Sequence, residues 1–230
     1  MNLFPATCLV CGKVLGREEL LVCEEDRLRV KPIASFPHRC ERCDRVLDVA
    51  LSRGLCYDCY ERGKVEGNLE KSRALFVYEG VVRELYQKMK YQGNFLAARE
   101  LLRIALPHQK LVAGWAEGCD VVTVVPSDWF SLWRRGFSPV IWFWKHFFPS
   151  LEEKILSRRF ALTKQKMLSR EERLRRIRGQ FVVKQRERIL GRRVLVLDDV
   201  YTTGSTLEET ARVLRENGAL RVMGGVIFRD

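Results

Sequence analysis

The sequence predicts an α/β protein in which a parallel-sheet domain follows a small cysteine-rich module. Seven of the eight cysteines fall within the first 59 residues, where long apolar runs are missing. From residue 69 onward, short β-branched runs alternate with amphipathic helical patterns, which is typical of a parallel sheet covered by helices. We therefore divide the chain into residues 1–68 and residues 69–230.

The elements of the second domain follow from the spacing of apolar residues. Residues 80–90 place Val81, Leu85 and Met89 on one helical face, whereas residues 121–125 form a β-branched run typical of a buried strand. The full expectation is strands over residues 74–78, 121–125, 194–197 and 222–228, and helices over residues 80–90, 95–106 and 206–217.

The composition excludes several classes of protein. Hydrophobic residues make up 47% of the chain and charged residues 30%, which is ordinary for a globular protein and excludes a disordered chain. The longest apolar stretch, residues 140–148, contains Lys145 and His146, whereas a membrane-spanning helix needs about 20 apolar residues. We expect no membrane span, no signal peptide and a cytoplasmic protein, because no basic start followed by an apolar run opens the chain.

The positive charge is concentrated in one part of the chain. The formal net charge is +12, and residues 157–193 hold fourteen basic residues against three acidic ones. A basic block of this kind indicates a polyanionic partner, either a phosphate-rich small molecule or a nucleic acid, although a solvated helix face has the same pattern.

The later cysteines form a complete set of four metal ligands. Two Cys-x-x-Cys pairs are separated by twelve residues, a spacing typical of a zinc ribbon. We expect a structural zinc ion here, since a module this small lacks a sizeable core and four thiolates leave no open position for catalysis. The expected ligands are Cys40, Cys43, Cys56 and Cys59.

The earlier cysteines form an incomplete set. Cys8, Cys11 and Cys23 have knuckle spacing, and Asp26 stands where a fourth cysteine is expected. A carboxylate can bind zinc, so a site with three thiolates and one aspartate is one possibility. His38 as the fourth ligand and an empty, degenerate knuckle are the alternatives.

A buried strand leads directly into two acids and a loop of small hydroxyl residues. Residues 194–197 carry Asp198 and Asp199 to the carboxyl end of the sheet, where open α/β sheets bind their ligands. Loop amides and the start of the next helix form an anion seat, and paired carboxylates suit vicinal hydroxyls, so the pattern indicates a sugar phosphate. The loop residues are Thr202, Thr203, Gly204, Ser205 and Thr206.

This stretch resembles the signature of type I phosphoribosyltransferases, which bind phosphoribosyl pyrophosphate. The resemblance implies that Asp198 and Asp199 hold the ribose hydroxyls, that residues 202–206 cradle the 5′-phosphate, and that magnesium accompanies the ligand. Purine-salvage members often carry an acid where this chain has Thr202, which argues against that activity. No side chain is indicated as a general base, so the catalytic residues stay unassigned.

Further motifs resemble those of the ComF family. Residues 78–93 look like its Y-x-G-x-(V/I)-R … K-Y-x-G opening, residues 135–137 its R-G-F motif, and residues 159–173 its R-x-x-x-T-x-x-Q-x-x-L … R stretch. The resemblance implies a zinc-binding N-terminal part, a phosphoribosyltransferase-like domain, and a role in DNA uptake beside other competence proteins. The chain departs from the family at residues 125–128 and 138–139, which affects turnover more than ligand binding.

Two questions about binding stay open at this level. Arg134 and Arg135 follow the middle strand and suit pyrophosphate oxygens, although they are equally typical of surface charges. A non-catalytic factor that binds single-stranded DNA is the alternative to a phosphoribosyltransferase, with a vestigial or regulatory phosphoribosyl pyrophosphate site. Its candidate stacking rings are Trp129, Trp133, Phe160 and Phe181.

Overall fold

The computed structural model describes residues 6–16, 21–48, 54–63, 67–127, 136–159 and 178–230. Its central sheet has four parallel strands in the order β1-β6-β5-β2. The strands are β1 (Ser72–Val77), β2 (Val121–Val124), β5 (Arg193–Tyr201) and β6 (Arg221–Arg229). The α/β class and all four expected strands are thereby confirmed.

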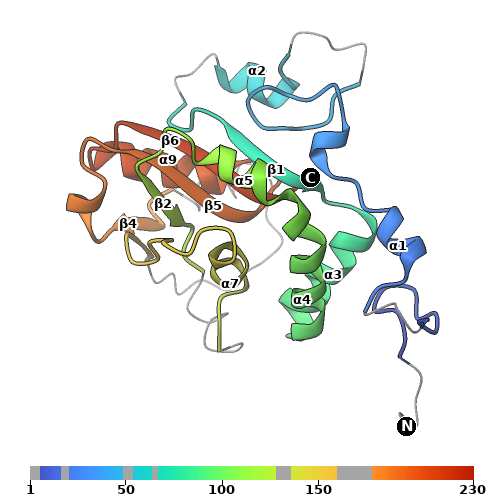
Figure 1. Cartoon of the computed structure of the whole chain (residues 1–230). Coiled ribbons are helices and arrows are strands. Elements are labelled where there is room, and N and C mark those ends of the chain that lie inside the picture. The colour runs from blue at the N-terminus through green and yellow to red at the C-terminus, as the bar shows by residue number, and fades with distance from the viewer. Residues whose placement is uncertain (1–5, 17–20, 49–53, 64–66, 128–135, 160–177) are drawn as a thin grey trace.

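Helices cover both faces of this sheet (Figure 1). Leu195 and Leu197 of β5 belong to the hydrophobic cluster on one face, whereas Val194 and Val196 belong to the cluster on the other. This alternation follows from the two-residue period of a strand. Helix α9 (Ser205–Glu216) packs on the second face. The helices that pack on the first face are α3 (Gly80–Gln92), α4 (Phe95–Ala105), α5 (Gln109–Trp115) and α7 (Pro139–Lys145).

The structure differs from the expected elements in several places, and helix α5 is one of the elements that were not expected. Strand β5 continues to Tyr201, so Asp198 and Asp199 lie within the strand and not after it. Helix α7 was not expected, because its Pro-Val-Ile-Trp-Phe-Trp-Lys sequence is apolar almost all round and shows no helical period. The antiparallel pair of β3 (Leu156–Arg158) and β4 (Phe181–Val183) was also missed, since each strand has only three residues.

The N-terminal segment contains two short helices and packs along the outer edge of β1 (Figure 1). Its backbone and side chains accept hydrogen bonds from strand amides: Ser72 N donates to Arg42 O at 2.7 Å and Ala74 N donates to Asp44 Oδ2 at 3.0 Å. The sheet edge is therefore covered, which removes an exposed pairing surface. The short elements are α1 (Glu24–Leu28), η1 (Ile33–Ser35) and α2 (Tyr57–Gly63).

The boundary at residue 68 stays a prediction, and the contacts across it are extensive. Both hydrophobic clusters of the sheet domain include cysteines from the N-terminal segment. Within the described part of the chain, no helix has the length and apolar character needed to cross a membrane.

Candidate functional site

The loop between β5 and α9 enters the helix through a glycine in the left-handed conformation. Gly204 precedes the helix with φ +74°, and a Cβ atom there would overlap the Tyr201 ring. Only glycine therefore fits at this position. Thr203 Oγ1 and Ser205 Oγ lie 2.9 Å apart across the turn. The helix that follows is twelve residues long and directs the positive end of its dipole at this loop.

A cavity of about 200 Å³ lies beside this loop. Asp198, Asp199 and Thr206 line it, as do Val125, Pro126 and Ser127 from the segment after β2. The cavity is therefore at the carboxyl ends of the two neighbouring strands β2 and β5, where open α/β sheets place their ligands. Tyr86, Lys90, Pro139, Val140, Arg158 and Val200 complete the lining.

Asp198 is the buried member of the acid pair, with 9% of its surface exposed. Its Oδ1 accepts a hydrogen bond from Asp199 N at 2.9 Å, and its carbonyl oxygen accepts one from Trp144 Nε1 at 3.0 Å. Burial, together with the neighbouring Asp199 charge, raises the pKa of Asp198 to about 8. This carboxyl group is therefore held in an environment that disfavours its charge.

Asp199 is held by two side chains from α3. Its Oδ2 accepts hydrogen bonds from the Tyr86 hydroxyl and from Lys90 Nζ, the latter at 2.9 Å, and Lys90 Nζ also donates to the Tyr86 hydroxyl at 2.6 Å. Burial and the Asp199 charge raise the pKa of Tyr86. Burial by itself would lower the pKa of Lys90, but Asp199 outweighs it and raises this pKa. The amine and phenol are therefore held in their protonated, donating forms.

Sequence reasoning did not identify Tyr86 and Lys90 as site residues. The sequence did contain a signal for this pair. Tyr86 and Lys90 are four residues apart and so lie on the same helical face, and both belong to the motif over residues 78–93. What the pattern lacked was any indication that this face meets Asp199, more than a hundred residues further along the chain.

The expected cationic residues are only partly placed. Arg134 and Arg135 lie outside the described residues, as do Trp129, Trp133, Phe160 and most of the family stretch over residues 159–173. Arg158 lines the cavity. Phe181 is 3% exposed and packs in the core, so its proposed role as a stacking ring is wrong.

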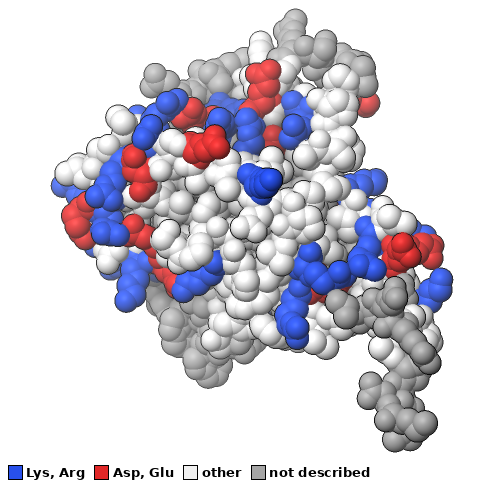
Figure 2. Space-filling model, in the orientation of Figure 1, with Lys and Arg blue, Asp and Glu red and all other residues white. Residues whose placement is uncertain are grey.

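The described part of the basic stretch is interspersed with acids. Arg188 Nε lies 2.7 Å from Glu152 Oε2, and Arg193 Nη2 lies 3.0 Å from Asp120 Oδ1. Figure 2 likewise shows Lys and Arg mixed with Asp and Glu around the rim of this face of the molecule. These pairs reduce the local positive potential that a nucleic-acid backbone would meet.

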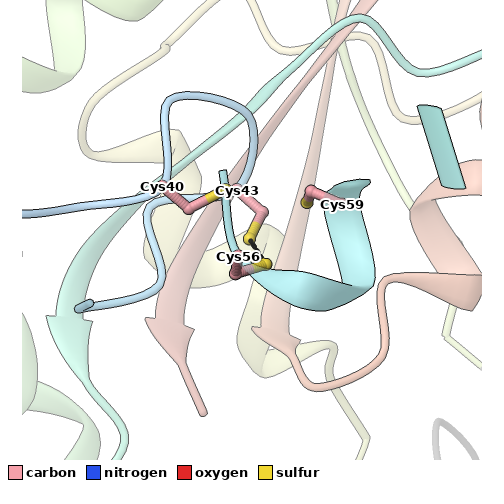
Figure 3. Close-up of side chains that lie close together, drawn as sticks. All are labelled: Cys40, Cys43, Cys56 and Cys59. Atoms are coloured by element: carbon pink, nitrogen blue, oxygen red, sulfur yellow. Dashed lines mark hydrogen bonds between the residues drawn. The ribbon is translucent and has the colours of Figure 1, made fainter. Parts of the chain in front are cut away.

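The four later cysteines converge on one point (Figure 3). Cys40 and Cys43 come from one turn, Cys56 directly precedes α2 and Cys59 lies in its first turn. All four sulfur atoms lie within 4.8 Å of one another, and Cys43 Sγ and Cys56 Sγ are 3.7 Å apart. Zinc–sulfur bonds of about 2.3 Å in a tetrahedron give sulfur separations of about 3.8 Å. The four buried thiols Cys40, Cys43, Cys56 and Cys59 therefore fit a structural zinc ion.

The earlier cysteines gather with Asp26 and not with His38. Cys11 Sγ and Cys23 Sγ are 3.8 Å apart, and Asp26 Oδ2 lies 3.2 Å from Cys8 Sγ. Three sulfur atoms and one carboxylate oxygen within 4.8 Å fit a second metal ion of the same size. Cys11 is exposed whereas the other three side chains are buried, so this site opens toward solvent.

Comparison with known proteins finds a domain profile in the C-terminal part of the chain and a partial structural match. A family profile described as "Phosphoribosyl transferase domain" matches residues 156–230, which include the acid pair and the loop. The allosteric regulatory enzyme of purine biosynthesis matches 54% of this chain and 26% of its own, at 22% identity and a TM-score of 0.33. The sheet, the loop and the matched profile define a phosphoribosyltransferase-like protein with a cysteine-rich N-terminal module.

Curated relatives narrow this class. Competence protein F from Haemophilus influenzae is 27% identical over 95% of this chain and 94% of its own length. Competence protein ComFC from Streptococcus pneumoniae is 26% identical over 92% and 94%, and DNA utilization protein YhgH from Escherichia coli K12 is 30% identical over 55% and 56%. These similarities, together with the matched profile, support the ComF-family classification that the motifs predicted.

Proposed function

We propose that this competence-related, phosphoribosyltransferase-like protein binds phosphoribosyl pyrophosphate, with its magnesium ion, in the cavity beside Asp198 and Asp199. One observation carries the proposal. Two carboxylates lie beside a glycine-opened helix N-terminus at the carboxyl edge of a parallel sheet. A ligand that combines vicinal hydroxyls with a phosphate matches both halves of this arrangement.

The roles of the residues follow from their chemistry. Asp198 and Asp199 accept hydrogen bonds from the ribose hydroxyls, and the amides and hydroxyls of residues 202–206 hold the 5′-phosphate. Two described cations, Lys90 and Arg158, line the cavity. Lys90 is paired with Asp199, so we assign Arg158 to the pyrophosphate end of the ligand. Magnesium neutralises pyrophosphate oxygens and is held mainly by the ligand itself.

Transfer to an acceptor would displace pyrophosphate at the anomeric carbon by a nitrogen nucleophile. The protein contributes orientation and charge stabilisation, because the described lining offers no clear general base. The two departures from the family motifs meet at this place, since Ser127 Oγ and Ser138 Oγ lie 2.9 Å apart. We therefore assign ligand binding to this cavity and leave the acceptor open.

Calorimetric titration with phosphoribosyl pyrophosphate and Mg²⁺ tests the proposal. The wild type should bind, and the Asp198→Asn/Asp199→Asn double variant should lose at least about tenfold in affinity, since each substitution replaces one acceptor oxygen of the pair by an amide donor. Asp120→Asn is the matched control, because Asp120 is an exposed acid paired with Arg193 at the opposite end of β5. Unchanged affinity in the double variant would refute the site, and no binding by the wild type would refute the ligand.

Single-stranded DNA binding is the second candidate function, and one observation favours it. The rings of Phe137, Phe95, Trp142 and His146 form a row with centroid distances of 6.2, 5.2 and 4.8 Å. Phe95 is 47% exposed, so its ring is available to stack on an unpaired base. Affinity for a short oligonucleotide should then fall steeply with salt and drop further in Phe95→Ala. Leu106→Ala is the control, as Leu106 is 40% exposed and lies at the other end of α4.

A further inference from the structure

A buried arginine contacts two regions: the loop of residues 202–206, here called the phosphate-binding loop, and the four-cysteine site of Cys40, Cys43, Cys56 and Cys59. Arg229 is the last residue of β6 and is 3% exposed. It pairs in register with Tyr201 at the end of β5, directly before the loop. An arginine can be buried only when its guanidinium group is well partnered. Besides the carbonyl of the adjacent Asp230, the partners of Arg229 come from two distant parts of the chain.

On the loop side, Arg229 fixes two peptide groups. Its Nη1 donates to Tyr201 O at 2.9 Å and to Thr202 O at 3.1 Å. In a trans peptide the N–H points opposite to the C=O. The amides of Thr202 and Thr203 therefore point away from the guanidinium group.

The same guanidinium group supports the turn itself. It lies over the Tyr201 ring at 4.7 Å from the centroid. The Tyr201 ring in turn packs directly against Gly204, where it fills the space that a Cβ would need. Gly204, Tyr201 and Arg229 thus pack against one another in that order, and this packing fixes the position of the loop relative to the end of the sheet.

On the cysteine side, Arg229 contacts a single residue twice. Its Nε donates to Cys43 O at 3.1 Å and its Nη2 donates to Cys43 Sγ at 3.6 Å. A metal-bound cysteine is a thiolate, and a thiolate is the stronger acceptor for a guanidinium N–H. Because the guanidinium group is planar and rigid, a displacement of Cys43 moves the donors that hold Tyr201 and Thr202.

We propose that Arg229 is a positioning residue that couples the four-cysteine metal site to the phosphate-binding loop. Metal bound at Cys43 holds the guanidinium group in place, and the guanidinium group holds the loop amides toward the ligand. This inference rests on the proposed function for the identity of the ligand. The coupling itself concerns only the loop backbone and the metal site.

The first test compares Arg229→Lys with the wild type, both loaded with zinc. Lysine keeps the positive charge but lacks the fork that reaches both Cys43 and the loop carbonyls. We expect at least tenfold weaker binding of phosphoribosyl pyrophosphate with Mg²⁺ by calorimetry, with the zinc content unchanged by elemental analysis. Arg221→Lys is the matched control, because Arg221 lies at the other end of β6 and pairs with Glu70 on the surface. Equal affinity of Arg229→Lys and the wild type would overturn the proposal.

The second test needs no ligand. Hydrogen exchange is followed in peptides over residues 200–206 before and after zinc is removed by a chelator, with residues 95–105 of α4 as the internal reference. We expect exchange to rise over residues 200–206 while the reference is unchanged, and zinc-loaded Arg229→Lys to show the same local rise. If exchange over residues 200–206 is unchanged in zinc-loaded Arg229→Lys, the coupling is overturned. This arm of the experiment remains decisive even if the zinc-free protein unfolds completely, because the variant is measured with zinc bound.

The two tests separate the two claims. A wild type that fails to bind phosphoribosyl pyrophosphate refutes the proposed function, and with it the ligand named here. The exchange experiment still decides whether Arg229 couples the metal site to the loop. A wild type that binds, with Arg229→Lys indistinguishable from it in both measurements, refutes only the coupling.

Discussion

Asp198 is the residue whose environment most clearly conflicts with its charge. Burial and Asp199 raise its folded-state pKa to about 8, whereas an aspartate in an unfolded chain titrates near about 4. Between these two values the folded state holds a proton that the unfolded state has lost. The stability contributed by the protonated form is therefore complete below about pH 4 and is lost as the pH rises toward 8.

The variant Asp198→Asn removes this titration while keeping an acceptor for Asp199 N. Relative to the wild type, it should gain stability as the pH rises from 5 to 8, on the order of a few kcal/mol at the upper end. Thermal unfolding of both proteins across this range measures the effect. The cysteines titrate equally in both proteins and cancel in the difference. A constant difference between the two melting temperatures would show that Asp198 is charged throughout.

Gly204 is required at its position for two separable reasons, backbone conformation and space. Its φ of +74° costs an alanine about 1 kcal/mol, and the added Cβ would also strike the Tyr201 ring. Gly93 isolates the first reason, because it has φ +65° and a Cβ added there would meet nothing within 4 Å.

Gly204→Ala should therefore destabilise the fold by at least about 2 kcal/mol and Gly93→Ala by only about 1 kcal/mol. Denaturant unfolding measures both. Gly204→Ala should also weaken binding of phosphoribosyl pyrophosphate, whereas Gly93→Ala should leave it unchanged. Equal costs for the two substitutions would mean that the Tyr201 ring moves aside freely.

At the scale of elements, the two cysteine clusters differ in their donors and in their exposure. The later cluster has four buried thiols, whereas the earlier one combines three thiols with Asp26 and has an exposed Cys11. Thiolates are softer and stronger zinc ligands than a carboxylate, and an exposed ligand gives a chelator a point of attack.

Zinc should therefore leave the wild type in two phases when a chelator is added, with about one equivalent released in each. The fast phase should belong to the earlier cluster, and Asp26→Cys should slow it while leaving the slow phase unchanged. Asp58→Asn is the control, because Asp58 pairs with Arg45 beside the later cluster. A colorimetric zinc indicator follows the release. One phase in the wild type, or an unaltered fast phase in Asp26→Cys, would contradict this assignment.

At the scale of the whole molecule, the N-terminal segment completes the sheet. It accepts hydrogen bonds from the amides of Ser72, Ala74 and Val77 along the free edge of β1. It also contributes to both hydrophobic clusters. A sheet that lost this cover would expose an unpaired edge and apolar surface together.

A chain truncated to residues 69–230 should therefore associate or precipitate where the full chain stays dispersed. Size-exclusion chromatography at several concentrations measures the difference. A truncated chain that elutes as a monomer and melts near the temperature of the full chain would show that the edge needs no cover. That outcome would also establish the boundary at residue 68 as a true domain boundary.

Local sequence patterns were sufficient for the strands, the knuckles and the acid-bearing loop. The unbroken β-branched runs identify buried strands because both faces of a parallel sheet are covered. The Cys-x-x-Cys spacing identifies metal ligands because one tight turn brings both thiols to one ion. Each of these signals is contained within a dozen or so neighbouring residues, and in each case the backbone geometry follows directly from the residue types.

Only the tertiary structure decided which of these local features meet. Tyr86 reaches Asp199 across 113 residues of sequence, and Arg229 reaches Cys43 across 186. No periodicity encodes such contacts, because they depend on the strand order β1-β6-β5-β2 and on the module closing over β1. By itself the sequence determined the position of the acid-bearing loop and of the two cysteine clusters. Only the fold decided that one buried arginine contacts both the loop and the later cluster, since the last strand ends between the two.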